Sequence, residues 1–179
     1  YGFAYYTEAD ILRVPRQTSQ AAYRINVIRY VIEQESPVHI ELLCKRVSTL
    51  FGYQRATVGV RQNISTIIRE HLQADVNKVG DFYFFKKLKR IQVRIPKTDQ
   101  LERKIDHISI DELAEAMLLI ATKSVGIMQN DLLVVTARVF GFNRTGGNIL
   151  TAMLKACDHL VTSQKVRNIE GKILVNLES

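Results

Sequence analysis

One short stretch occurs twice in this chain of 179 residues. The first copy is Leu50-Phe51-Gly52-Tyr53-Gln54-Arg55, and the second, 89 positions later, is Val139-Phe140-Gly141-Phe142-Asn143-Arg144. In each copy an apolar helical pattern ends at the glycine and another begins after the arginine, as in a helix-turn-helix. An internal repeat of this period predicts two similar small modules rather than one continuous core.

The first module, residues 19–86, is predicted to contain three helices and a β-hairpin. The helices follow Thr18 or Ser19, span about Ile40 to Leu50 and begin near Ala56, because apolar residues recur there at helical spacing. Residues 76–79 and 82–85 are predicted strands, joined by a Gly-Asp pair in which the glycine tolerates the positive φ of a tight turn. Three helices followed by a hairpin predict a winged helix.

The second module, residues 108–179, repeats this order. It opens with Ser109-Ile110-Asp111-Glu112, a capping box in which the serine and the glutamate satisfy each other's free backbone amides. Helices are predicted from this box, from Asn130 to Phe140 and from Thr145 to about Thr162, and a hairpin follows. The predicted fold is therefore mainly α, of the α+β class. It consists of tandem winged helix-turn-helix modules, with an N-terminal arm at 1–18 packed on the first module and a basic linker at 87–107.

Positive charge is concentrated around the linker. The chain has a formal net charge of +7 and a pI of about 9.5, which favours an anionic partner such as nucleic acid. Residues 86–104 hold eight Lys or Arg against Asp99 and Glu102. Apolar and polar residues alternate from 90 to 95, which predicts a half-buried strand with Arg90 and Arg94 on a basic outer face. Both phosphate contact and protection of an exposed strand edge fit such a face.

The third helix of the first module is the predicted recognition helix, because polar residues line the arc opposite its apolar face. The predicted DNA-binding residues are Arg55, Arg61, Gln62, Ser65, Arg69, Lys86, Lys87, Lys89 and Arg90. At the offset of the repeat, Arg61, Ser65 and Arg69 correspond to Leu150, Leu154 and Asp158. The two leucines are predicted interaction residues, covered by the first module, the linker, a second copy or a longer parent protein. Burial within their own module is the alternative.

Arg55 and Arg144 occupy the same position in the two copies, although the helices that follow them differ in character. The shared position predicts a structural role, in which each guanidinium bonds carbonyls or an acidic group at the turn. A phosphate contact by Arg55 is the alternative interpretation.

The repeat and the segments before it resemble a known family. The matching segments are Ser36-Pro37-Val38-His39 with Phe51-Gly52-Tyr53-Gln54-Arg55, and Ile108-Ser109-Ile110-Asp111-Glu112-Leu113 with Phe140-Gly141-Phe142-Asn143-Arg144. They resemble the uncharacterised C-terminal winged-helix domain of large bacterial superfamily-one DNA helicase-like proteins, which often follows a nuclease-like domain. The resemblance covers most of residues 20–175. It implies DNA transactions by a longer parent chain whose ATPase and nuclease lie elsewhere, and it carries over no catalytic residue.

No catalytic, metal or cofactor site is predicted in this chain. The four histidines are scattered, and neither cysteine lies at metal-ligand spacing from one of them. Cys44 and Cys157 fall on apolar helical faces, which predicts reduced, buried thiols in a cytosolic protein. No apolar run reaches the roughly 18 residues that a membrane span needs.

These patterns predict a non-catalytic DNA-binding accessory domain of a helicase-like protein in the bacterial cytoplasm. Its predicted partners are DNA and the remainder of the parent chain. The alternative is a protein-interaction or dimerisation module that docks on the parent helicase or nuclease.

Overall fold

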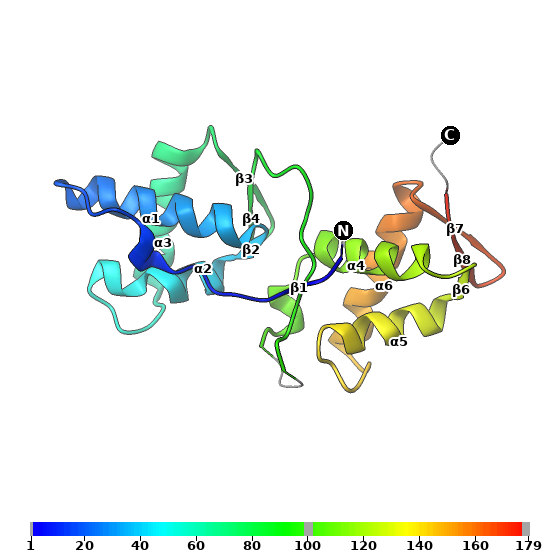
Figure 1. Cartoon of the computed structure of the whole chain (residues 1–179). Helices are drawn as coiled ribbons and strands as arrows, with labels where there is room; N and C mark the ends of the chain where they lie inside the picture. The colour runs from blue at the N-terminus through cyan, green and yellow to red at the C-terminus, as the bar shows by residue number, and fades with distance from the viewer. Residues whose placement is uncertain (1, 99–101, 177–179) are drawn as a thin grey trace. The chain divides into compact units, whose positions relative to one another are not determined.

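The computed structural model describes residues 2–98 and 102–176, and the chain divides into two compact units (Figure 1). The first unit is Thr7–Arg90, and the second unit combines Tyr1–Tyr6 with Ile91–Ser179. Both units mix helices with small sheets, so the fold is of the mainly helical α+β class, as predicted. Asp99 of the predicted linker and the ends of the predicted arm and second module, at 1 and 177–179, lie outside the described residues.

Three helices and a three-stranded antiparallel sheet form the first unit. The helices are α1 (Gln20–Glu35), α2 (Ile40–Val47) and α3 (Val58–Ile67). The sheet has the order β2-β4-β3, with β2 at Val38–His39, β3 at Val76–Val79 and β4 at Phe82–Phe85. Short helical turns occur at η1 (Ile11–Arg13), η2 (Ser48–Phe51) and η3 (Ile68–Leu72), the last of which continues α3.

Hydroxyl side chains mark where two of these helices begin. Ser19 Oγ accepts a hydrogen bond from the Ala22 amide at 3.4 Å, and Thr57 Oγ1 accepts one from the Val60 amide at 3.3 Å. Apolar side chains of all three helices then meet in one core: Val27, Ile28, Val31 and Ile32 of α1, Leu43 and Val47 of α2, and Val60 and Ile64 of α3. This core fixes which side of α3 faces solvent.

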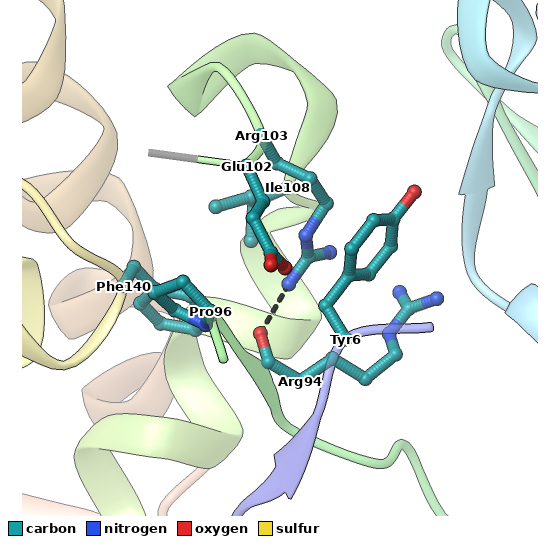
Figure 2. A pocket seen from close by; sticks show the side chains of 7 residues that line it. All are labelled: Tyr6, Arg94, Pro96, Glu102, Arg103, Ile108 and Phe140. Carbon is teal, nitrogen blue, oxygen red and sulfur yellow. Dashed lines mark hydrogen bonds between the residues drawn. The ribbon is translucent and has the colours of Figure 1, made fainter. Parts of the chain in front are cut away.

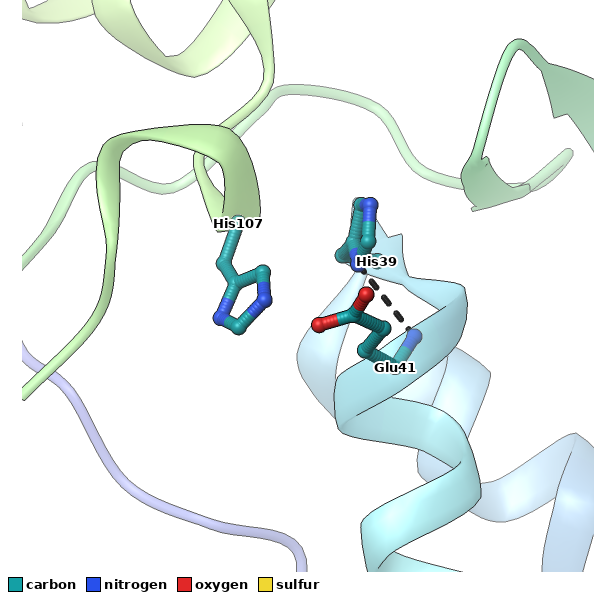
Figure 3. A group of neighbouring side chains, drawn as sticks. All are labelled: His39, Glu41 and His107. Carbon is teal, nitrogen blue, oxygen red and sulfur yellow. Dashed lines mark hydrogen bonds between the residues drawn. The ribbon is translucent and has the colours of Figure 1, made fainter. Parts of the chain in front are cut away.

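Two polar side chains join the helices of the first unit to its sheet. Ser36 Oγ, just after α1, accepts from the Phe85 amide of β4 at 2.9 Å. His39 Nδ1, at the end of β2, accepts from the Glu41 amide at 3.2 Å and so caps α2 (Figure 3). Each bond satisfies a backbone amide that has no partner within its own helix or strand.

The second unit repeats this arrangement. Its helices are α4 (Ile110–Thr122), α5 (Gln129–Val139) and α6 (Asn148–Thr162). Its three-stranded sheet has the order β6-β8-β7, with β6 at Ile127–Met128, β7 at Val166–Ile169 and β8 at Lys172–Val175. Both hairpins therefore lie where the sequence predicted them, and each gains a short third strand that the sequence did not indicate.

The repeated motif has the same backbone turn in both units. The Tyr53 amide donates to the Ser48 carbonyl at 3.2 Å, and the corresponding Phe142 amide donates to the Ala137 carbonyl at 3.0 Å. The motif glycine is left-handed in both copies, with φ of 78° and 86°. Only glycine adopts such angles without strain, which explains its place in both copies.

The predicted arm and linker are not separate segments in the structure. Residues 7–18 belong to the first unit, whereas Ala4–Tyr5 forms strand β1, which pairs in parallel with β5 (Arg94–Ile95) of the second unit. The Tyr6 amide also donates to the Ile95 carbonyl at 2.7 Å. The turn η4 (Ile105–His107) follows before α4. The second unit is thus assembled from two pieces of chain that flank the first.

Cys44 and Cys157 are free and buried, as predicted. Burial raises the pKa of both thiols, so both are protonated near neutral pH and are poor nucleophiles. Within the parts of the chain that the structure describes, no helix has both the length and the apolar composition needed to cross a bilayer.

Candidate nucleic-acid interface

The solvent-facing arc of α3 and η3 is polar. Arg61, Gln62 and Arg69 are exposed, on the side opposite the apolar core. Ser65, predicted to join them, is only half exposed, and its Oγ lies 3.5 Å from the Tyr83 hydroxyl of β4. Three of the four residues predicted on this helix are therefore accessible to a ligand, and Ser65 contacts the sheet of its own unit.

Each arginine on this face lies beside one carboxylate. Arg61 Nη2 donates to Asp81 Oδ1 at 2.5 Å, and Arg69 Nη2 donates to Glu70 Oε1 at 3.3 Å. Asp81 lies in the turn between β3 and β4, so the first pair connects α3 to the hairpin. All four side chains are about half exposed or more, and such pairs contribute only about 0–1 kcal/mol to stability. A phosphate group can therefore replace either carboxylate at low cost.

Arg55 is exposed in the turn between η2 and α3. The predicted structural bonds are absent: neither Arg55 nor Arg144 bonds or ion-pairs with another described residue. Two carbonyls of this turn, those of Ser48 and Thr49, accept from the amides of Tyr53 and Gly52 instead. The phosphate contact is the interpretation of Arg55 that stays a prediction.

Four basic residues follow β4 and close the first unit. Lys86, Lys87, Lys89 and Arg90 are all exposed. Lys86 Nζ donates to the Gln73 carbonyl at 2.7 Å, which ties this segment to the end of η3. The ammonium groups of Lys87 and Lys89 have no bond to any described residue and are available to an anion.

Lys78 of the hairpin was not predicted as part of this face. It is exposed on β3, and its Nζ lies 5.7 Å from the centre of the Tyr83 ring. The alternation of β3 could not have indicated it, because Val76, two residues earlier on the same face of the strand, is buried. The hairpin therefore adds one cation to those of α3.

The prediction of a basic outer face in the linker is wrong for Arg94, which is buried in the second unit. Its Nη2 donates to Glu112 Oε2 at 2.7 Å, and Arg103, also buried, donates from Nη2 to Glu112 Oε1 at 2.8 Å. Glu112 itself is 0% exposed, and a buried carboxylate requires paired counter-charges. These two cations of the predicted linker are therefore not available to a ligand.

The capping box predicted at the start of α4 forms only in part, because the Glu112 side chain belongs to this buried cluster. Ser109 Oγ accepts from the Glu112 amide at 3.1 Å, as predicted, but the Glu112 side chain accepts from the Arg94 amide at 2.9 Å instead of returning to the serine. Burial by itself would raise the pKa of Glu112. The adjacent guanidinium groups of Arg94 and Arg103 outweigh burial and hold that pKa below its usual value.

Aromatic rings complete this buried cluster. Figure 2 shows the small pocket beside it, lined by Tyr6, Arg94, Pro96, Glu102, Arg103, Ile108 and Phe140. The Arg103 guanidinium lies 4.8 Å from the centre of the Tyr6 ring and 5.9 Å from that of Phe140. Tyr6 directly follows β1, so Arg103 helps to hold the N-terminal strand on the second unit.

The net positive charge lies almost entirely in the first unit. Residues 7–90 hold 14 Lys and Arg against eight Asp and Glu, a formal net charge of +6. The remaining residues hold 11 against 10, a net charge of +1. Arg94 and Arg103 are already paired, whereas the arginines of α3 and η3, Lys78 of the hairpin and the basic residues of 86–90 are exposed.

On the second unit, the helix that corresponds to α3 presents apolar side chains. Leu150 and Leu154 of α6 are 39% and 38% exposed, and Asp158 is exposed beside them. Burial of the leucines within their own module, the alternative left open by the sequence, is therefore only partial. The two third helices differ on their outer faces as the aligned repeat predicts.

The comparison with protein families gives a match that lies within the first unit. The profile of a family described as "Protein of unknown function (DUF3320)" matches residues 19–62, which include α1, α2 and the first half of α3. Neither the comparison with curated proteins nor that with solved structures found a match. Residues 19–62 are thus similar to an uncharacterised family domain.

Proposed function

We propose that both units are winged helix-turn-helix modules and that the first is a non-catalytic DNA-binding accessory domain of a bacterial, cytoplasmic helicase-like protein. In this proposal α3 enters the major groove of duplex DNA, and the β3–β4 hairpin is the wing. Arg55 and residues 86–90 contact phosphates, which position the module on the duplex.

The observation that carries this proposal is the charge difference between two units of the same architecture. One unit has a net charge of +6 and the other +1, and the excess is exposed around the third helix of the basic unit. A fold-stabilising role does not account for this excess, because Lys87, Lys89 and Arg55 bond to no described residue. Attraction of a polyanion accounts for it directly.

The helicase-like parent is proposed from two further observations. The first is the resemblance of residues 20–175 to the C-terminal domain of helicase-like proteins. The second is the match of residues 19–62 to a family that is itself uncharacterised, which is compatible with that resemblance.

Titration of the chain with a blunt duplex, followed by fluorescence anisotropy at increasing salt, tests the proposal. The logarithm of the binding constant should fall linearly with the logarithm of the salt concentration, with a slope of about −0.9 for each phosphate contact. Lys87→Gln with Lys89→Gln should flatten the slope by roughly 1.8 and weaken binding equally for all duplex sequences, because phosphates carry no sequence information.

Lys155→Gln with Lys165→Gln is the matched control. It removes the same charge from exposed positions of the second unit and should leave the slope unchanged. Failure of the unmodified chain to bind duplex at low salt would contradict the proposed function. Equal flattening in both double variants would mean that only the total charge matters and not the face of the first unit.

The exposed leucines of α6 support a second candidate function, in which the chain is a protein-interaction or dimerisation module. Leu150→Ser with Leu154→Ser should lower the free energy of unfolding by only about 1–2 kcal/mol each, since the fold leaves both side chains partly in water. Sedimentation velocity, which reports the oligomeric state, tests this second function. A dimer that becomes a monomer in this variant favours dimerisation, whereas a monomeric unmodified chain argues against it.

A further inference from the structure

The two copies of the repeated motif have the same backbone turn, but the aromatic residue after the glycine is exposed in one copy and buried in the other. Tyr53 of the first unit is 42% exposed, whereas Phe142 at the same position of the second unit is 5% exposed. Phe142 belongs to the core cluster of its unit, and Tyr53 lies outside the core cluster of the first. The turn itself therefore does not require an exposed aromatic ring.

The turn fixes the backbone of Tyr53, and its hydroxyl lies near the first turn of α3. The Tyr53 amide donates to the Ser48 carbonyl at 3.2 Å, which fixes the backbone. The Tyr53 hydroxyl lies beside Gly59 in the first turn of α3, 3.5 Å from where a β-carbon would be. A ring that is ordered in advance loses little conformational entropy when it binds a partner.

Charge and chain position link this ring to the basic face. Arg55, two residues further along the same turn, is exposed and has no bond to a described residue. Both residues shortly precede α3, and the exposed arc of α3 and η3 carries Arg61 and Arg69. An exposed aromatic ring next to an unpaired cation is the combination that proteins use to stack an unpaired base and bind its phosphate.

We propose that Tyr53 and Arg55 bind an unpaired nucleotide of DNA at the end of the duplex, with the Tyr53 ring stacked on the base and the Arg55 guanidinium on the phosphate. This proposal rests on the proposed DNA-binding function and specifies its substrate as a junction between duplex and single strand. Stacking tolerates any base, so the contact recognises the absence of pairing rather than a sequence.

The experiment compares a blunt duplex with the same duplex carrying a short single-stranded thymidine tail. The unmodified chain should bind the tailed duplex more tightly. Tyr53→Ala should lower affinity for the tailed duplex by at least about fivefold, the low end of the cost of losing one stacked base, and leave affinity for the blunt duplex unchanged. Tyr53→Phe, which keeps the ring, should retain the preference.

Two further variants separate stacking from loss of structure. Tyr53→Leu keeps an apolar side chain against α3 but has no ring, so it should behave as Tyr53→Ala with an unchanged melting temperature. Tyr5→Ala removes a tyrosine that is 64% exposed on the second unit and should not affect binding to either DNA.

The outcomes distinguish this inference from the proposed function. A chain that binds blunt duplex without preference for the tail, or a Tyr53→Ala variant that weakens both DNAs equally, would overturn the junction proposal and leave duplex binding intact. A chain that binds neither DNA at low salt would overturn both.

Discussion

Replacement of Glu112 by alanine is expected to lower the free energy of unfolding of the second unit by about 3–5 kcal/mol. The change removes a carboxylate that is completely buried and leaves the guanidinium groups of Arg94 and Arg103 without their shared counter-ion. It also removes the acceptor of the Arg94 amide. Urea unfolding measures the loss, and hydrogen exchange identifies the unit that opens.

Asp111→Ala is the matched control for Glu112. Both acidic residues lie in the first turn of α4, where each complements the helix dipole, but the Asp111 side chain is 40% exposed. Its loss should cost no more than about 1 kcal/mol. Equal losses in the two variants would show that the helix terminus, and not the buried cluster, is responsible.

Low pH is expected to destabilise the same buried cluster of Glu112, Arg94 and Arg103. The pKa of Glu112 in the folded chain lies below its ordinary value of 4.5, so the carboxylate contributes its full stability above about pH 4.5. That contribution is lost as pH falls from there through the folded pKa, because the unfolded chain binds the proton first. Glu112→Gln should lose this part of the acid sensitivity, while the first unit provides an internal reference.

The second large effect is expected for Arg46→Ala in the first unit, again about 3–5 kcal/mol. Arg46 donates from Nε and Nη2 to Glu35 at 2.8 and 3.2 Å, and its Nη1 lies 3.0 Å from Glu8. Glu35 is 1% exposed, so the variant removes the cation that bonds to a buried carboxylate. The Ala9 amide, which donates to Glu35 at 2.8 Å, should lose its protection from hydrogen exchange at the same time.

Two variants test this interpretation of Arg46. Lys45→Ala removes the neighbouring cation of α2, which is 70% exposed and 4.0 Å from Glu8, and should cost no more than about 1 kcal/mol. Glu35→Leu combined with Arg46→Met replaces both charges by apolar groups and should recover much of the loss, because no buried charge then lacks a partner. A double variant as unstable as Arg46→Ala would contradict the assignment to charge.

Features that depend on residues close in sequence could be predicted from the sequence. The repeat, both hairpins and the glycines that follow η2 and α5 are of this kind, and so is the exposed arc of α3 and η3 with Arg61, Gln62 and Arg69. The third strands β2 and β6 could not be predicted, because two residues are too few for an alternating pattern. The bond between Arg61 and Asp81 could not be predicted either, because the two residues meet only when the β3–β4 hairpin packs beside α3.

Arg94 was predicted on the wrong side for a similar reason, since its burial depends on a residue that is distant in the sequence. Periodicity assigns polar residues to the solvent side, and the alternation from 90 to 95 does so correctly for Arg90. Arg94 is buried because Glu112, 18 residues later, supplies a buried counter-charge. Such a tertiary ion pair leaves no local pattern, although an acidic residue in a strongly apolar helix was a possible signal.

The two-piece construction of the second unit sets an order of folding during synthesis. β1 leaves the ribosome before its partner β5, which lies 90 positions later in the chain. The first unit is complete once Arg90 has been added, so all contacts of its core are available while β1 still has an unpaired edge. Since domains fold as units when their residues emerge, the first unit should form ahead of the second. β1 therefore stays unpaired, with an edge open to non-native contacts, until the first unit and then β5 have been synthesised.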